Sequence, residues 1–534
     1  MKYQSQKVAY AYFLAAMGLF GIQVLGGLLA GWIYVSPNTL SEILPFNIIR
    51  MIHTNALIVW LLLGFFGAAY FLVPEESERE LWSVKLAYLQ LIILVVGTLG
   101  AVGSYLVGIH GGREFLEQPL WVKFGILVAA LIFLLNISMT VLAGRKTAIT
   151  GVLLTGLWLL SLLWVFAFIN PSNLSLDKMY WWFVVHLWVE GTWELVMAAI
   201  LAFLMLKLTG VDREVVEKWL YVIVATALFS GILGTGHHFY WIGLPAYWQW
   251  TGSIFSAFEV VPFFAMMSFA FIMVWKGRRN HPNKAALLWA LGSATVAFFG
   301  AGVWGFLHTF HGVNFYTHGT QITAAHGHLS FYGAYVAMNL AIITYAMPLL
   351  RGRAPYNQVL NMISFWLMTG GMAFMTFVLT FAGTIQTHMQ RIVGDYYMDV
   401  QDQLGLFYLM RFGAGARWCW EPCCSSTARW WCGAKSSRRT PARWSVKRRE
   451  RAFPRHDGAV LPPRRTGMCA VRGGPCQRSA PVAQGADRLR QDAVRRTYGG
   501  ASGASAVHRR LPRRPVGGRS DRAISAARRG DGMG

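Results

Sequence analysis

Eleven long apolar runs constrain the fold of this chain more than any other feature. Each is long enough to cross the hydrocarbon core of a bilayer, which takes about 20 apolar residues in a helix. They lie at roughly 10–35, 46–73, 85–108, 121–143, 148–169, 180–207, 217–243, 252–276, 284–308, 318–348 and 358–385. A twelfth run begins near Val400 and is lost after Gly415. Because a spanning segment must satisfy its own backbone hydrogen bonds, we expect an all-α polytopic membrane protein with a bundle of twelve transmembrane helices in a lipid bilayer.

Charge divides the chain into two regions. The formal net charge is +24, yet residues 1–410 contain 20 Lys and Arg against 17 Asp and Glu, whereas residues 411–534 contain 28 against 7. All six cysteines also lie in the second region. The basicity therefore gives no reason to expect a nucleic-acid partner for the membrane part. We predict a membrane domain over residues 1–415 and a disordered basic tail over residues 416–534.

The basic loops alternate along the chain. Fifteen Lys and Arg flank one side of the predicted membrane, and the other side carries only Arg50, Arg113, Lys123, Lys178 and Arg391. This bias places the N-terminus in the cytoplasm, which for a bacterial chain means insertion in the inner membrane. Six histidines then share one depth, in the outer, periplasmic half of the membrane: His53, His186, His237, His238, His326 and His328.

Two of these histidines, His326 and His328, lie two residues apart. On an α-helix that step turns about 200°, so the rings leave nearly opposite faces. Ionisable groups in hydrocarbon are costly and rarely kept without a partner. One helix that sends an imidazole each way can serve two metal centres lying side by side, as electron transfer between two haems requires.

A second group of polar residues has the spacing of a single metal site. His186 and Glu190 are four residues apart on one helix face, which Glu194 extends by another turn. His237 and His238 are adjacent at a glycine-rich helix end. Three imidazoles with one carboxylate suit iron, and the carboxylate favours non-haem iron over copper.

Other polar residues have a plainer interpretation. A lone membrane histidine is more often a hydrogen-bonded helix contact than a ligand, and we assign no metal role to His110, His308, His311, His318 or His388. We interpret the first and last of these as residues near helix ends and the middle three as loop or interface residues. Glu259 is either a proton-relay carboxylate or a hydrogen-bonded polar contact, and we favour the relay.

Four segments carry a resemblance to a known family. They are Arg50-Met-Ile-His53-Thr-Asn, His186-Leu-Trp-Val-Glu190-Gly, Gly234-Thr-Gly-His237-His238 and Ala324-Ala-His326-Gly-His328. These segments resemble the haem-copper oxidase superfamily, and more narrowly the large subunits of the cytochrome c-dependent nitric oxide reductases. The resemblance extends from residue 1 to about residue 415. It implies a twelve-helix bundle of the haem-copper oxidase type, here with a corrupted twelfth helix.

The resemblance also implies roles for individual residues. His53 and His328 would hold a low-spin haem b, and His326 would be the axial ligand of a high-spin haem b₃. The facing non-haem iron would be bound by His186, His237, His238 and Glu190. Glu114 matches a calcium ligand, Glu117 a residue at a proton entrance, and Glu194 and Glu259 match carboxylates that carry protons to the site. Members of this family reduce two molecules of nitric oxide to nitrous oxide and water.

Two alternative functions stay open at this point. The first is a haem-copper oxygen reductase. Relatives of that kind with a tyrosine on this helix turn join its ring to a metal-ligand histidine, whereas this chain has Glu190 there and no tyrosine. The second is a proton-coupled transporter. The spacing of His326 and His328, together with His53, argues against a transporter, since a proton wire does not need it and two haems do.

The source of electrons is inferred from missing motifs. No Cys-x-x-Cys-His segment occurs, so the chain does not attach a c-type haem itself. Quinol-oxidising relatives carry a long N-terminal extension, whereas here the first apolar run begins within ten residues. We therefore expect a membrane-anchored cytochrome c subunit as partner, supplied by a soluble cytochrome c or a similar donor.

The composition changes abruptly after Gly415. If the segment Ala416-Arg-Trp-Cys-Trp-Glu-Pro-Cys-Cys-Ser-Ser426 is written with GC-rich codons and read in a neighbouring frame, it becomes Ala-Leu-Val-Leu-Gly-Ala-Leu-Leu-Leu-Leu. That is the rest of a transmembrane helix, and it suggests a frameshift. The alternatives are an authentic basic tail that binds nucleic acid or acidic lipid, or a zinc site, for which the cysteines lack paired spacing.

Overall fold

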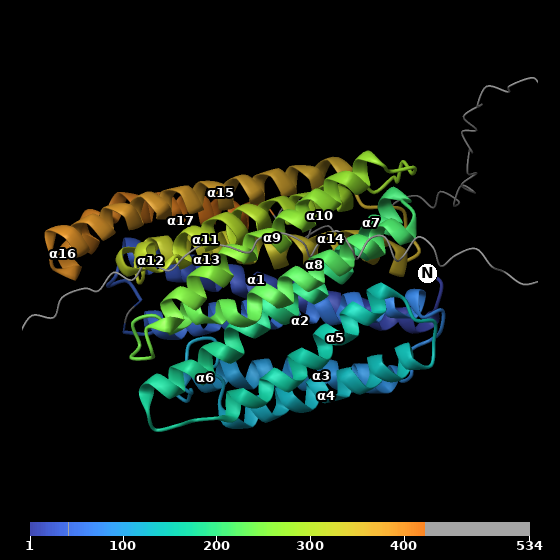
Figure 1. Ribbon diagram of the computed structural model, residues 1–534, viewed down its shortest axis with the longest axis horizontal. Helices are drawn as coiled ribbons and strands as arrows, with labels where there is room; N and C mark the ends of the chain where they lie inside the picture. Colours follow the sequence, from blue (N-terminus) through green and yellow to red (C-terminus); the bar gives the residue numbers. More distant parts are fainter. Residues whose placement is uncertain (41, 422–534) are drawn as a thin grey trace, which may run out of the picture. The chain divides into compact units, whose positions relative to one another are not determined.

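The computed structural model describes residues 1–40 and 42–421, with side chains through residue 416. These residues belong to one compact unit, Met1–Arg438. Every regular element in the described part is helical, and Figure 1 shows the long helices running side by side along a common direction. The predicted all-α class is thus confirmed. The predicted disordered tail falls, from residue 422 onward, outside the described residues.

Eleven helical segments of the described part are long and apolar enough to cross a membrane. They are Gln4–Val35, Phe46–Glu76, Val84–Leu106, Leu120–Leu142, Ala148–Phe168, Leu174–Thr209, Arg213–Phe239, Tyr247–Trp275, Lys284–Thr309, Gln321–Leu350 and Gln358–Val393. Each coincides with one predicted apolar run.

Several of these segments combine α-helices with short 3₁₀ or π turns. The helices are α1 (Val8–Val35), α2 (Phe46–Glu76), α3 (Val84–Leu106), α4 (Leu120–Leu142), α5 (Ala148–Trp164), α6 (Leu174–Leu187), α7 (Trp193–Thr209), α8 (Arg213–Gly234), α9 (Tyr247–Trp275), α10 (Lys284–Ala297), α11 (Gly305–Thr309), α12 (His311–Thr317), α13 (Gln321–Phe331), α14 (Ala337–Leu350), α15 (Gln358–Thr387), α16 (Tyr397–Gln403) and α17 (Gly405–Glu421).

The twelfth predicted helix corresponds to α17, which packs against α1 and α15. Phe412 of α17 contacts Trp32 of α1, with ring centroids 5.1 Å apart. Arg411 lies over the ring of Tyr34, its Cζ atom 4.9 Å from the centroid. The helix is described as far as Glu421, so residues 416–421, part of the predicted disordered tail, are helical.

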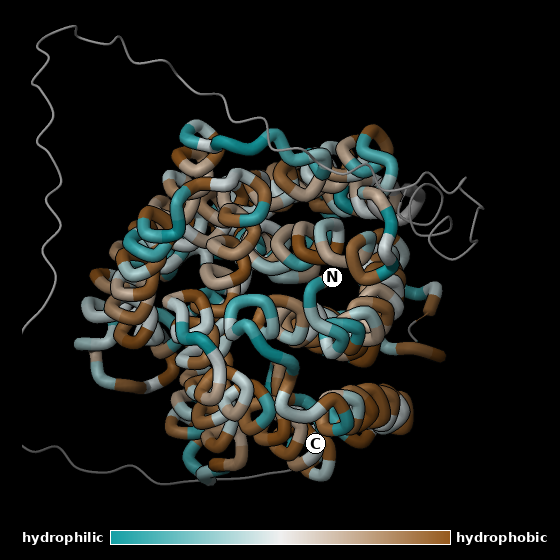
Figure 2. Tube along the Cα trace, turned by 90° about the vertical axis from the view of Figure 1, so that its right-hand side faces the viewer, coloured by the Kyte–Doolittle hydropathy of each residue, from teal (hydrophilic) through white to brown (hydrophobic). Residues whose placement is uncertain are grey.

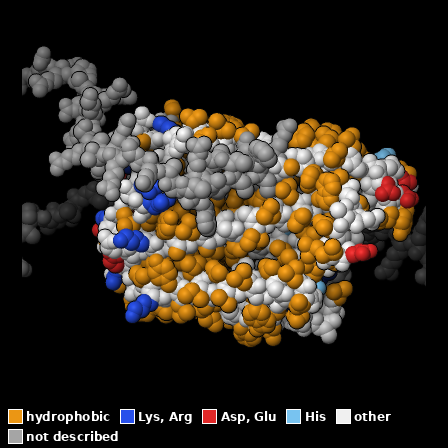
Figure 3. Space-filling view, turned by 180° about the vertical axis from the view of Figure 1, so that it is seen from behind, with side chains coloured by type: hydrophobic (Ala, Val, Ile, Leu, Met, Phe, Trp, Pro, Cys, Tyr) orange, Lys and Arg blue, Asp and Glu red, His pale blue; other side chains and the backbone are white. Residues whose placement is uncertain are grey.

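The outer surface of the bundle suits a hydrocarbon environment. Large apolar side chains such as Leu25, Ile92 and Trp275 are exposed on it. Figure 3 shows hydrophobic side chains covering the middle of one face and Lys and Arg gathered toward one end. In Figure 2, a view along the bundle from the end that holds the N-terminus, the connections between helices are largely hydrophilic. The bundle thus presents an apolar surface where a water-soluble protein would present a polar one.

Three segments form the centre of the bundle. In Phe46–Glu76, Leu174–Thr209 and Gln321–Leu350, 83% of the most apolar window is buried, against 33–50% in the other eight. These central segments carry His53, the His186–Glu190–Glu194 series, and the pair His326 and His328. The sequence thus places most of its predicted ligands on the three most buried segments.

Wide π-helical turns interrupt the helices near these ligands. Three of them are η3 (Trp188–Thr192), η5 (Phe298–Trp304) and η6 (Tyr332–Val336). A π turn adds a residue to the helical turn and is often found at a functional site. Here η3 contains Glu190, η5 contains Gly300, and η6 directly follows the helix of His326 and His328.

An ion pair with one buried partner joins two helices at the basic end of the bundle. Glu76 of α2 is 3% exposed and accepts hydrogen bonds from Arg213 at 2.7 and 3.0 Å and from Thr147 at 3.0 Å. We expect Glu76→Ala to lower the free energy of unfolding by about 1–3 kcal/mol, since it removes the acceptor that these two partly buried donors share. Thermal unfolding in detergent measures this effect.

The matched control is Glu214→Ala. Its partner Lys218 lies at 2.8 Å, but both side chains are more than 70% exposed. Exposed ion pairs contribute little to stability, so no measurable shift is expected. Equal losses of stability in the two variants would show that burial does not determine how much the Glu76–Arg213 ion pair contributes to the free energy of unfolding.

Candidate metal centre and cofactor cavity

The structure brings His186, Glu190, His237 and His238 together. One ligand atom from each lies within 4.8 Å of all the others, and no other such group of three or more His, Cys, Asp or Glu residues occurs in the described part of the chain. His186 Nδ1 is 3.4 Å from Glu190 Oε2. Three imidazoles and a carboxylate at this spacing have the number and chemistry of ligands that one iron ion accepts.

His186 is held so that one ring nitrogen points to the cluster. Its Nε2 atom donates to the carbonyl of Gly231, at 2.8 Å, across the contact between α6 and α8. Its Nδ1 atom is buried and has no hydrogen-bond partner. An imidazole with one nitrogen bonded to a carbonyl and the other bare is the usual state of a histidine metal ligand.

The two adjacent histidines are oriented by other elements. They lie in η4 (Thr235–Phe239), the 3₁₀ turn that ends α8. His237 Nδ1 is 2.8 Å from the hydroxyl of Ser256 in α9. The ring of His238 stacks on Trp182, with centroids 4.2 Å apart and planes 4° apart. Each ring is therefore restrained on a side away from the other ligands.

The three remaining histidines share one hydrogen-bonding pattern. In each, Nδ1 lies near a backbone carbonyl: His53 bonds to Gln23 at 2.7 Å, His328 to Ala324 at 2.7 Å, and His326 to Gly300 at 3.1 Å. A carbonyl only accepts, so the proton resides on Nδ1 and Nε2 keeps its lone pair. The same bonding fixes the tautomer of histidines that ligate metals through Nε2.

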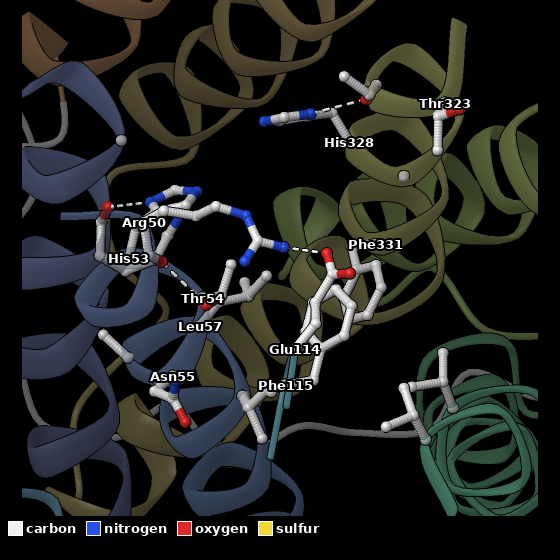
Figure 4. Close-up of a pocket in the computed structure, with 18 of the residues that line it drawn as sticks. Arg50, His53, Thr54, Asn55, Leu57, Glu114, Phe115, Thr323, His328 and Phe331 are labelled. Atoms are coloured by element: carbon white, nitrogen blue, oxygen red, sulfur yellow. Dashed lines mark hydrogen bonds and ion pairs between the residues drawn. The ribbon is translucent and has the colours of Figure 1, made fainter. Parts of the chain in front are cut away.

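All six histidines and Glu190 line one cavity of about 880 Å³. Figure 4 shows His53 and His328 on opposite sides of the open space, with the paired side chains of Arg50 and Glu114 beside it. His326 bonds to η5, whereas His328 bonds within its own helix. The two rings thus have different neighbours, as their two-residue spacing predicts. His53 of α2 and the two histidines of α13 therefore present their rings to a single cavity.

Two more predicted carboxylates lie beside the cluster. Glu194 is 2% exposed and Glu259 is 9% exposed. In each side chain the Oε1 atom has no hydrogen-bond partner. Glu259 lies near enough to Glu190 and Glu194 for their charges to interact. A Cβ atom at Gly234 would collide with Glu259, so this glycine is needed for the carboxylate to approach the cluster.

The two carboxylates of the predicted loop, Glu114 and Glu117, both lie near Arg50. Arg50 is ion-paired with Glu114, and its Nη1 atom is 3.8 Å from Glu117 Oε1. Glu117 is 2% exposed and accepts a hydrogen bond from Asn55 at 3.1 Å. Burial raises the pKa of the Glu117 carboxyl. Glu114 belongs to no metal-ligand group among the described residues, so its calcium role stays a prediction.

The structure decides between the two alternatives predicted for His308, a loop residue or an interface residue. His308 lies in α11 and is 6% exposed, which is the interface alternative. Its two ring nitrogens lie 3.0 Å and 3.1 Å from the hydroxyls of Thr317 and Thr323. The sequence did not reveal this environment because both partners follow a helix break. With both nitrogens hydrogen-bonded, the ring has the environment of a structural histidine.

Sequence reasoning missed the residues that orient the ligands. Ser330 lies 3.0 Å from His326 Nδ1 and shares it with the Gly300 carbonyl. Its position four residues after His326 is a signal that the sequence does contain. Trp182 and Ser256 have no comparable signal, because they reach their histidines from other helices.

A glycine provides a test of the His53 position. A Cβ atom at Gly27 of α1 would lie 2.7 Å from Cε1 and 2.9 Å from Nδ1 of the His53 ring. If His53 ligates one of two haems, as the resemblance implies, Gly27→Ala is expected to displace the ring and to lower haem per chain to about half. Quantifying haem per chain measures this change.

Gly21→Ala on the same helix is the control, since nothing lies within 4 Å of a Cβ atom there. It is expected to leave haem content unchanged, because alanine is the better helix former. Normal haem content in the Gly27 variant would contradict a ligand role for His53.

Comparison with known proteins agrees with this geometry. Residues 7–416 match the family described as Cytochrome C and Quinol oxidase polypeptide I. The chain is 55% identical over 437 residues to a nitric oxide reductase subunit of Stutzerimonas stutzeri, an alignment that covers 78% of this chain and 92% of that protein.

A solved structure supports the fold. The chain resembles a structure described as a heme-copper terminal oxidase dimer, with a TM-score of 0.62, 14% identity, and coverage of 78% of this chain and 82% of the other. At that identity the likeness concerns the fold alone. The family match and the relative carry more, and they confirm the resemblance that the four histidine-containing segments predicted: the chain belongs to the cytochrome c and quinol oxidase polypeptide I family, the haem-copper oxidases.

Proposed function

We propose that this chain is the catalytic subunit of a respiratory nitric oxide reductase. The observation that carries the proposal is the cluster of His186, His237, His238 and Glu190 in the same cavity as His326. A carboxylate in the ligand set favours iron over copper. The 55% identity to a nitric oxide reductase subunit supports the same substrate.

The bonded Nδ1 atoms of three histidines suit axial ligation. His53 and His328 would hold a low-spin haem b, and His326 a high-spin haem b₃ facing the non-haem iron of the cluster. When bound, the two irons would hold two nitric oxide molecules close together and act as Lewis acids on their oxygens. The protein's part is to fix the imidazoles and to keep the cavity closed by apolar helices.

The reaction consumes two protons and two electrons for every two nitric oxide molecules, with nitrous oxide and water as products. Glu194 and Glu259, buried beside the cluster, would hold and pass protons toward Glu190. Glu114 lines the cavity, and Glu114 and Glu117 both lie near Arg50. We assign Glu117 to the proton entrance and Glu114 to a calcium ion that would need oxygen ligands from the haems as well.

Partner and orientation follow from the same proposal. A relative that is itself named as one subunit acts within a complex. We propose a membrane-anchored cytochrome c subunit as this chain's partner and a soluble cytochrome c or similar donor beyond it. The fifteen-to-five bias of basic loop residues supports a cytoplasmic N-terminus in the bacterial inner membrane. The cluster would then face the periplasmic half.

Metal and haem stoichiometry tests the proposal. The purified chain is expected to hold about two b-type haems and one non-haem iron, and no copper. We expect His237→Ala to lose the iron and to lower nitric oxide turnover at least about 100-fold while both haems remain, because a ligand of the non-haem metal is removed without touching the haem ligands.

The control is His311→Ala, a histidine that bonds to Ser253 and does not line the cavity. It is expected to keep both iron and turnover. One copper in place of the iron would indicate an oxygen reductase. A chain that holds neither haem nor metal would favour the transporter alternative.

We further propose that a frameshift near codon 415 produced the tail. The family match ends at residue 416, one residue after the predicted break. Sequencing the coding DNA is expected to show a missing or extra base there, with the restored frame reading Ala-Leu-Val-Leu-Gly-Ala after Gly415. An uninterrupted frame that encodes the basic tail would refute this.

A further inference from the structure

A tyrosine in η6, the π turn that follows the helix of His326 and His328, donates a hydrogen bond to the turn that carries Glu190. The hydroxyl of Tyr335, in η6, donates to the carbonyl of Val189, in η3, at 2.5 Å. Tyr335 is 2% exposed. Val189 directly precedes Glu190, so the bond reaches the backbone of the proposed metal-ligand turn from the segment that follows His326 and His328.

Packing alone does not account for a tyrosine here. The ring contacts Trp193, Phe331 and Phe65 edge-on, with centroids 5.2, 5.6 and 6.1 Å away. Phenylalanine would make the same contacts. A buried hydroxyl is costly unless it is hydrogen-bonded, so the bond to Val189 is the feature that distinguishes tyrosine from phenylalanine at this position.

The turn that accepts this bond departs from regular helix. In a π turn the usual amide-to-carbonyl pairing is widened, and carbonyls become available to side chains. Two hydroxyls bond to carbonyls of η3: Thr192 donates to Trp188 at 2.9 Å and Tyr335 donates to Val189. The first bond stays within the turn, whereas the second comes from another segment and fixes the turn's backbone relative to that segment.

The same turn also packs closely against a glycine. A Cβ atom at Gly231 would collide with the carbonyl of Glu190, and the carbonyl of Gly231 accepts the hydrogen bond from His186. The turn therefore contacts α8 through Gly231 and η6 through Tyr335. Small displacements of this turn would change the 3.4 Å separation of Glu190 and His186.

We propose that Tyr335 is a positioning residue, whose hydroxyl sets the place of Glu190 beside His186 through the Val189 carbonyl. The inference rests on the proposed function, since it takes these two residues as ligands of the non-haem metal. It also couples the helix of His326 and His328 to the metal-ligand turn by one hydrogen bond. Tyr335 acts through Val189 and is not itself a ligand of the metal.

The test compares Tyr335→Phe with Tyr12→Phe in the purified, haem-loaded chain. Tyr12 is also buried and also donates to a backbone carbonyl, that of Ala87 at 2.7 Å, but Ala87 lies in α3, which carries no proposed ligand. The measurements are non-haem iron per chain, the half-time of iron loss to a chelator, haem content and melting temperature. Tyr335→Phe is expected to lose iron about 10-fold faster with haem content retained, as loss of an orienting partner does.

The outcomes separate the two proposals. Faster iron loss in Tyr335→Phe but not in Tyr12→Phe, at equal melting temperatures, supports the positioning role. Iron loss at the wild-type rate in Tyr335→Phe, or equal acceleration in both variants, overturns it. His186→Ala tests the underlying site. If this variant keeps its iron, the proposed ligand set is wrong. If it loses the iron while Tyr335→Phe loses iron at the wild-type rate, only the positioning role is refuted.

Discussion

The centre of this bundle depends on the cost of placing imidazoles and carboxylates in an apolar environment. Five of the six histidines predicted as ligands lower that cost by giving one ring nitrogen a hydrogen-bond partner. For His53, His186, His326 and His328 the partner is a backbone carbonyl, and for His237 it is a serine hydroxyl. The second nitrogen is thereby left for a ligand, so the bonds that stabilise these rings also prepare them for metal.

The π turns and some glycines help these buried side chains to reach their hydrogen-bond partners. The π turns η3 and η5 provide the carbonyls of Val189 and Gly300, which accept from Tyr335 and His326. His53, His186 and His328 bond instead to carbonyls of α1, α8 and α13. Glycines then allow close approach, as at Gly27 beside His53 and Gly231 beside Glu190. Irregular backbone is tolerated here because it is packed within protein.

The proposed chemistry follows from this arrangement. All six histidines and Glu190 line one cavity, and ligands from different helices would hold two metal centres near each other. Carboxylates at Glu194 and Glu259 extend from the cluster into the bundle, where an unpaired charge is expensive and a proton is therefore readily held. The function proposed for the chain needs the cavity, the ligands for both metal centres and the buried carboxylates together, and no single helix supplies all of them.

The sequence by itself determined the membrane segments and the candidate ligands. Hydrophobic length set eleven membrane segments, since hydrocarbon thickness requires a minimum run, and residue spacing identified His186 with Glu190 and separated His326 from His328. It did not reveal Tyr335, Trp182, Ser256 or the burial of His308, because these contacts join residues from different helices and no periodic pattern encodes them. Only the tertiary structure decided which carbonyl each imidazole meets, since that depends on helix packing and on π turns that composition does not mark.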